Sequence, residues 1–227
     1  MTAREWLKEQ AHPQGMVWSF QGTSVTRTKI GRRKLRLFGC GCCRCFWDHL
    51  PDDEHRRAVE VAELFADGHA TKQQLAAVRT TAESLNTDSY HRAAGYGEHE
   101  ATAASIVCGL THASPFEAAF HMTCYGLPLA GYCGDGKTAN RLICDLLRDI
   151  FGNPFRPVAF ASTWRTDTAV ALARMMYEAR EFSAMPILAD ALQDAGCDSD
   201  DILNHCREPK QVHVRGCWVV DLVLGKE

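Results

Sequence analysis

The sequence predicts an all-α fold, a compact multi-helix bundle of roughly nine to eleven helices, with a short extended C-terminal segment as one alternative. Through most of the chain, apolar residues recur at spacings of three and four, the period of one face of an α-helix. Glycine, proline, and hydroxyl or acidic residues stand between these segments, where helices begin and end. We find no alternation of strands and helices, so a parallel sheet is not predicted.

The composition is that of a folded chain with a substantial core. The chain has 227 residues, of which 46% are hydrophobic and 23% charged. We expect a single helical domain over 1–227. A subdivision near 153–165 is the alternative, because Gly152 and Pro154 end a helix there. The net charge of −3 gives no overall attraction to nucleic acid or to a membrane.

The cysteine content indicates a reducing compartment. The chain has 11 cysteines, an odd number, and no N-terminal apolar segment typical of a secretory signal. We therefore expect thiols rather than a disulfide framework. No apolar run approaches the length of a membrane span. These features predict a cytoplasmic protein without a membrane partner.

Amphipathic patterns predict helices along the N-terminal half. The exception is segment 11–31, which has Pro13 and several glycines but no helical period, so we predict a loop. The predicted helices cover 3–10, 33–50, 52–67, 71–92, 98–110 and 115–127.

The C-terminal part has clear start and stop signals. Pro186 suits the first turn of a helix, and Gly196 suits the position just after its end. A second short helix follows and ends before Pro209. The final apolar run, 217–224, is compatible with a buried helix or a strand.

A dense group of cysteines lies in the helix predicted over 33–50. Cys40 and Cys43 are three residues apart, so both side chains could reach one metal ion. The alternative is that they are compact core residues. The Cys-x-x-Cys sequence of Cys42 and Cys45 lies in mid-helix, whereas a redox motif starts a helix after a strand.

A second group of candidate ligands lies near the C-terminus, at His205, Cys206, His213 and Cys217. Thiolate and imidazole are the ligands that zinc prefers. Neighbouring side chains on a helix point about 100° apart, so positions 205 and 206 rarely both reach one metal. The candidate ligands of a structural zinc are therefore Cys206, His213 and Cys217, with Cys40 and Cys43 from the first group.

Residues 131–138 match the P-loop pattern G-x-x-x-x-G-K-[ST]. In that interpretation Gly131 and Gly136 shape the loop, Lys137 neutralises phosphate and Thr138 binds magnesium. A P-loop follows a buried parallel strand, and the preceding sequence has Gly and Pro where β-branched residues belong. A turn between two helices explains the same residues. ATP or GTP binding is therefore the alternative function.

Basic residues are frequent from Arg27 to Arg36, and such a run can bind phosphate backbones. No aromatic residues that could stack on bases alternate with them, and the whole chain is acidic. We favour a solvated helix start and expect no nucleic-acid partner.

Three segments together resemble a family of uncharacterised bacterial proteins. They are RKLRLFGCGCCR at 33–44, LLRDIFGNPFRP at 146–157 and HVRGCWVVDLVLGK at 213–226. The resemblance covers both ends of the chain and much of its C-terminal half. It implies no known activity, substrate or catalytic residue.

The sequence-based hypothesis is a non-enzymatic intracellular binding or adaptor protein with an unknown protein partner and a structural Cys/His metal site. No convergent acid–base set is visible, so no catalytic residue is predicted.

Overall fold

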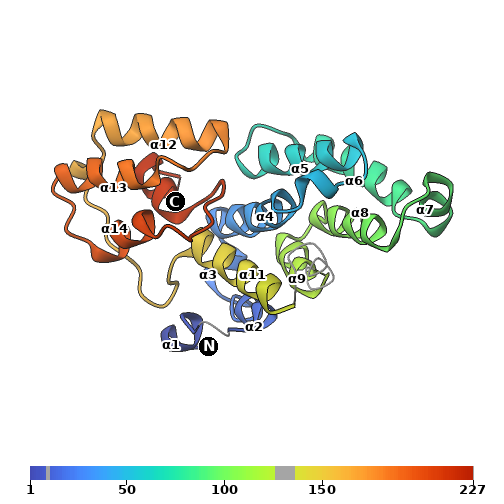
Figure 1. The fold of residues 1–227 in the computed structure, drawn as a ribbon, viewed down its shortest axis with the longest axis horizontal. Coiled ribbons are helices and arrows are strands. Elements are labelled where there is room, and N and C mark those ends of the chain that lie inside the picture. The colour runs from blue at the N-terminus through green and yellow to red at the C-terminus, as the bar shows by residue number, and fades with distance from the viewer. Residues whose placement is uncertain (9–10, 126–135, 227) are drawn as a thin grey trace. The chain divides into compact units, whose positions relative to one another are not determined.

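The computed structural model describes residues 1–8, 11–125 and 136–226 and consists of α-helices, without a β-strand in those residues (Figure 1). The predicted all-α fold is confirmed. The described residues form 14 helices, more than expected, because several are only one or two turns long. None of them is long and apolar enough to cross a membrane.

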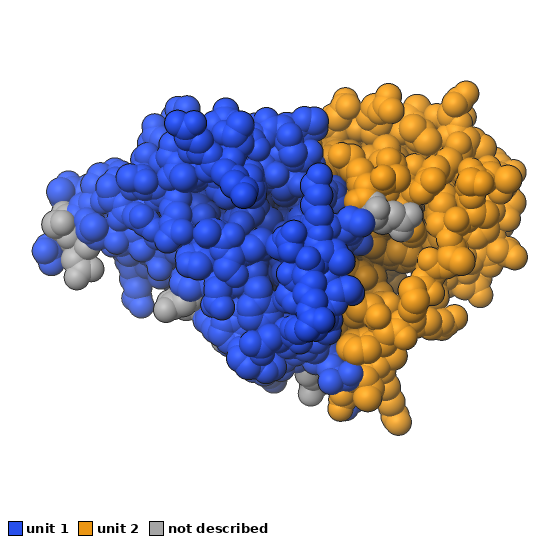
Figure 2. All heavy atoms as spheres, turned by 180° about the vertical axis from the view of Figure 1, so that it is seen from behind, with its two compact units in different colours: residues 1, 8–144 blue, residues 2–7, 145–227 orange. Residues whose placement is uncertain are grey.

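The chain divides into two compact units, which Figure 2 shows in different colours. The first holds Met1 and Lys8–Cys144, and the second holds Thr2–Leu7 and Asp145–Glu227. Each unit has helices and a core of its own. That 1–227 makes a single domain stays a prediction.

The first unit contains the helices of the N-terminal half, and several of them begin at a residue whose side chain caps the helix. Thr28 caps the longest of them by accepting a hydrogen bond from the Gly31 N–H, and Thr71 and Gln74 form a capping box. The helices are α2 (Pro13–Trp18), α3 (Ser24–Arg27), α4 (Lys29–Arg44), the 3-10 helix η1 (Trp47–His49), α5 (Asp53–Ala66), α6 (Lys72–Leu85), α7 (Asp88–Ala94), α8 (Glu98–Leu110) and α9 (Pro115–Tyr125).

Helix α4 is the centre of the first unit. It packs against α3, α5, α8 and α9, and α6 packs against α5 and α8. The buried side of α4 includes Leu35 and Phe38 together with Cys40, Cys42 and Cys43. Burial on several sides explains why this helix is rich in small residues, since these let neighbouring helices approach closely.

Two expectations about this unit were wrong. Segment 11–31, predicted as a loop, forms α2 and α3, because Pro13 starts one helix and Thr23 caps the other. The helix predicted over 71–92 is broken: Asn86 leaves the helical conformation and Thr87 caps α7. Local capping residues decided both cases where the apolar period was weak.

The second unit contains α1 (Ala3–Trp6), the end of α11 (Gly136–Phe151) and the C-terminal helices. Trp6 attaches α1 to the end of α11, since its Nε1–H donates to the Gly152 carbonyl at 2.8 Å. The final apolar run is a helix, so the extended alternative is not adopted. The remaining elements are the 3-10 helix η2 (Ser162–Trp164), α12 (Asp167–Ala179), α13 (Met185–Asp194), α14 (Asp200–Arg207) and α15 (Trp218–Leu224).

Candidate metal centre

One group of metal-ligating side chains converges among the residues that the structure describes. Asp149, His205, His213 and Cys217, all in the second unit, each bring one ligand atom within 4.8 Å of the others. Carboxylate, imidazole and thiolate are all ligands of transition metals in proteins. The cluster can therefore hold a metal ion.

The four side chains come from four positions of the second unit. Asp149 lies in the last turn of α11 and His205 in the last turn of α14. His213 lies in the connection between α14 and α15, and Cys217 is the N-cap residue of α15. A metal ion bound here would link two helices, the connection and the start of a third helix.

The distances between the ligand atoms suit a four-coordinate site. Asp149 Oδ1 lies 2.7 Å from His213 Nδ1 and 3.2 Å from His205 Nε2. Cys217 Sγ lies 3.3 Å from His205 Nε2 and 3.9 Å from His213 Nδ1. In a tetrahedral zinc site the ligand atoms lie about 3.3–3.7 Å apart, because metal–ligand bonds are about 2.0–2.3 Å. The observed distances scatter around this range.

The cluster is almost fully buried. The side chains of Asp149 and Cys217 are buried, and those of His205 and His213 are 11% and 6% exposed. The second carboxylate oxygen, Asp149 Oδ2, accepts the Val214 N–H at 2.9 Å. Such an outer contact fixes the orientation of the carboxylate and leaves Oδ1 for the centre.

The surroundings set the charge of each group. Burial would raise the pKa of Asp149, but its hydrogen bonds with His205 and His213 contribute most to outweighing burial, and the pKa is lowered. Burial is the largest cause that lowers the pKa of His205, and the pKa stays lowered although Asp149 raises it. Burial and the negative charge of Asp149 raise the pKa of the Cys217 thiol. The metal-free cluster therefore holds a carboxylate, a neutral His205 and a protonated thiol.

A divalent cation would make the centre electrically neutral. A bound metal requires Cys217 as thiolate, and its charge together with that of Asp149 balances a 2+ ion. The imidazoles bind as neutral ligands. Because an uncompensated charge is costly in a buried site, a divalent ion suits this ligand set better than a monovalent or trivalent one.

The structure brings two of the predicted C-terminal ligands together and leaves the third outside. His213 and Cys217 belong to the cluster, whereas Cys206 packs into the apolar core of the second unit. Burial raises the pKa of the Cys206 thiol to about 12. Positions 205 and 206 face different directions on α14, and it is His205 that faces the cluster.

Cys40 and Cys43 lie in α4 of the first unit and are not part of the cluster. Both are buried, and burial is the main reason why the pKa of each thiol is raised well above its usual value. The nearby Glu63 carboxylate forms an ion pair with Arg44, which donates hydrogen bonds to it from Nε at 2.9 Å and from Nη2 at 3.0 Å. These thiols have the surroundings of core residues.

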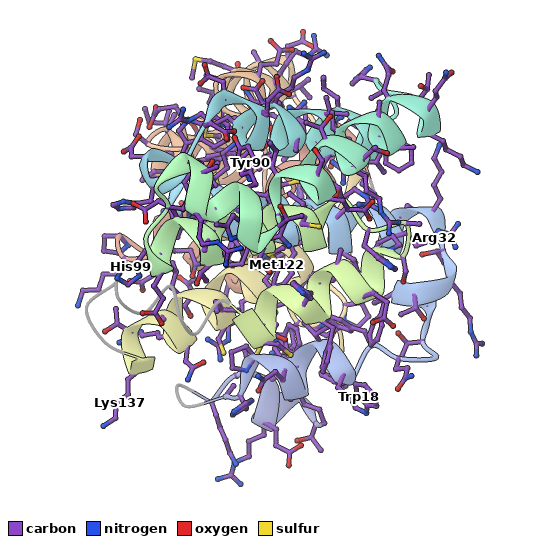
Figure 3. All side chains as sticks on the ribbon, turned by 90° about the vertical axis from the view of Figure 1, so that its right-hand side faces the viewer. Trp18, Arg32, Tyr90, His99, Met122 and Lys137 are labelled. Atoms are coloured by element: carbon purple, nitrogen blue, oxygen red, sulfur yellow. The ribbon has the colours of Figure 1, made fainter. Side chains whose placement is uncertain are left out.

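The P-loop-like segment is only partly described. Gly131 and the four residues after it lie outside the described residues, and Gly136 begins α11. Lys137 and Thr138 are exposed on the first turn of α11, and Figure 3 shows the Lys137 side chain extending away from the helix. Nucleotide binding stays a prediction. The described residues contain no strand that could precede a P-loop.

The basic run of the N-terminal part does not form one uniform surface. Arg27, Lys29 and Arg32 are exposed, and Figure 3 shows Arg32 at the edge of the molecule. Arg33 pairs with Asp67 at 2.9 Å, and Arg36 is buried. The absence of a nucleic-acid partner stays a prediction.

The ligand set predicted from the sequence did not include two members of the cluster, Asp149 and His205. Asp149 carried a usable signal: it follows Leu142 by seven residues and Leu146 by three, so it lies on the apolar face of its helix. An acid in that position needs a buried partner. Nothing in the sequence showed whether position 205 or 206 faces the site.

No protein-family model, no curated protein and no solved structure matches this chain. The candidate metal centre therefore rests on its own geometry and on the chemistry of its four side chains.

Proposed function

We propose that the chain binds one zinc ion through Asp149, His205, His213 and Cys217, and that this zinc stabilises the second unit of a non-enzymatic binding or adaptor protein. The observation that carries the proposal is the convergence of four buried ligand atoms within 4.8 Å of one another. The ten cysteines that the structure describes carry thiols, and we propose a cytoplasmic location, in which thiols stay reduced.

The ligand types favour zinc over other common metals. Calcium and magnesium take oxygen ligands, whereas this cluster offers a single carboxylate. Copper(II) binds nitrogen and sulfur strongly but prefers tetragonal geometry. Zinc accepts nitrogen, sulfur and oxygen ligands in a tetrahedron, which agrees with the observed distances.

The number of protein ligands favours a structural role. A catalytic zinc usually has three protein ligands and one open position for water or substrate. Here four side chains are available, and the cluster is almost fully buried. Its ligands also hold the irregular connection between α14 and α15, where a metal crosslink would replace missing regular structure.

The first test is elemental analysis of the reduced protein, purified without a metal-affinity tag. We expect one zinc per chain in the wild type and a loss of zinc in Cys217→Ser and His205→Ala. Cys206→Ser and Cys43→Ser are matched controls, because both remove buried thiols outside the cluster. A metal-free wild type, or equal loss of zinc in Cys43→Ser, would contradict the proposal.

Cobalt replacement tests the ligands directly. Co²⁺ in a tetrahedral site with a thiolate has strong visible bands and a sulfur-to-metal charge-transfer band. We expect Cys206→Ser to keep that charge-transfer band and Cys217→Ser to lose it. The opposite result would show that Cys206, and not Cys217, is the thiolate ligand.

A further inference from the structure

The first unit has a pocket of about 310 Å³ that is separate from the metal centre. Phe65 of α5, Leu75 and Ala76 of α6, and Ala113 after α8 provide an apolar lining. This volume is in the range of small-molecule sites. The apolar lining favours a ligand with a hydrocarbon or aromatic body.

Two cations frame this lining. Lys72 and Arg79 also line the pocket, and both belong to α6. With Leu75 and Ala76 between them, the spacing of three, four and seven residues places all four on one face of the helix. The cations are thus two turns apart, about 10 Å along the axis, with the apolar strip between them.

Both cations retain donors for a ligand. Arg79 donates from Nε to Glu83 Oε1 at 2.7 Å, which occupies one of its five N–H groups. Lys72 is exposed and forms no ion pair with the residues that the structure describes. An anion in the pocket would meet charged donors at either end of the strip.

A third positive charge lies behind the pocket wall. Arg36 is 1% exposed and donates to the carbonyls of Leu110 at 2.8 Å, His112 at 3.0 Å and Ala113 at 3.4 Å. Its guanidinium lies 5.5 Å from the centre of the Phe65 ring.

No carboxylate pairs with Arg36 among the described residues. A buried cation without a counter-ion makes the potential at the neighbouring wall positive, because the surrounding protein screens it poorly. The charge behind the wall and the charges at the rim therefore have the same sign.

We propose that this pocket binds a small carboxylate with an apolar body, of the class of medium-chain fatty acids. The hydrocarbon body would lie on Phe65 and Leu75, and the carboxylate would accept hydrogen bonds from Lys72 or Arg79. Cations are disfavoured by all three positive charges, and strongly hydrated anions such as inorganic phosphate leave the apolar strip uncovered.

The test is calorimetric titration of the full chain with octanoate and with octanamide, which has the same body without the charge. We expect saturable binding of octanoate. Octanamide should bind at least about tenfold more weakly, because it cannot form charge-assisted hydrogen bonds. Equal binding of both, or no saturable binding of octanoate, would overturn the proposal.

Variants locate the site. Lys72→Gln/Arg79→Gln should weaken octanoate binding about tenfold and leave octanamide unchanged. Lys29→Gln/Arg174→Gln removes the same charge from exposed positions outside the pocket and should bind like the wild type. Ala76→Phe fills the pocket and should abolish both. Equal weakening in the control double variant would show general charge attraction and overturn the site.

Discussion

The two units each hold an aspartate whose carboxylate lies 2.7 Å from a histidine Nδ1. In the first unit the pair is Asp52 and His55, and in the second it is Asp149 and His213. The pair is the same, but its other neighbours differ. Asp52 accepts hydrogen bonds from the hydroxyls of Tyr96 at 2.7 Å and Tyr90 at 3.4 Å.

Asp149 instead faces His205 and Cys217. Tyrosine hydroxyls satisfy a carboxylate by donating hydrogen bonds to it, which completes a hydrogen-bond network. Imidazole and thiolate offer lone pairs, which point at a common centre and suit a cation. The third and fourth neighbours, rather than the carboxylate–histidine pair, therefore distinguish the candidate metal centre from the hydrogen-bond network of Asp52.

The cysteines show the same difference. Helix α4 has several buried thiols, but they belong to one helix and have no converging histidines among the described residues. The cluster of the second unit has one thiol, Cys217, and gains its other ligands from separate elements. Convergence from different elements, rather than a high local density of cysteine, brings the candidate ligands together.

Among the tests of the difference between the two units, removal of the proposed zinc is expected to have the largest effect. A chelator should destabilise the second unit by about 4 kcal/mol if free zinc was near a thousandfold above its dissociation constant. Hydrogen exchange should then accelerate in α14 and α15, with α5 and α8 unchanged. Equal acceleration in both units would break the distinction between them.

Replacing each aspartate by asparagine tests whether only the pair of the second unit, Asp149 and His213, contributes to zinc binding. Asp149→Asn should weaken zinc binding by about 100-fold, because the centre loses a ligand and its charge balance. Asp52→Asn should leave zinc affinity unchanged, which makes it the matched control. Competition with a chromophoric chelator measures the zinc affinity of both variants. A loss of affinity in Asp52→Asn would contradict the assignment of the zinc to the cluster that contains Asp149.

Replacing a core thiol should affect stability and not metal content. Cys43 is fully buried, so Cys43→Ser should lower the free energy of unfolding by about 1–3 kcal/mol, because a hydroxyl replaces an apolar thiol. Cys43→Ala, which adds no polar group, should cost less. Urea unfolding gives the stabilities, and zinc loss in either variant would make α4 part of the metal site.

The Asp52 network should give a smaller, pH-dependent contribution. Burial opposes its ionisation, but hydrogen bonds from Tyr96 and His55 outweigh it and lower the pKa of Asp52 below 3.8. A lowered pKa stabilises the fold above that value, and the contribution is lost as the pH falls through the folded-state pKa.

Asp52→Asn should therefore cost about 1 kcal/mol near neutral pH. The difference in the free energy of unfolding between Asp52→Asn and the wild type should shrink as the pH falls through the folded-state pKa of Asp52. Urea unfolding near neutral pH and at acidic pH checks this. A pH-independent difference would show that the network does not depend on the charge of the Asp52 carboxylate.

Much of the fold could be predicted because the relevant information is local. The start of a helix at 71 was predicted from the amphipathic pattern. The end of the helix that begins near Pro186 was predicted from Gly196, which has φ 89°. The short helices in 11–31 were missed because each is too brief to show a period. His213 and Cys217 were found by residue type alone, whereas Asp149 was not, since it is distant in sequence.

The sequence by itself determined the helical fold class, most helix positions and two of the candidate ligands near the C-terminus, His213 and Cys217. These follow from apolar period, capping and side-chain chemistry, which act within a few residues. The tertiary structure decided that His205 rather than Cys206 faces the centre, and that Asp149 reaches it across more than fifty residues. The physical reason is that a metal site requires atoms to meet in space, and helix packing controls that meeting.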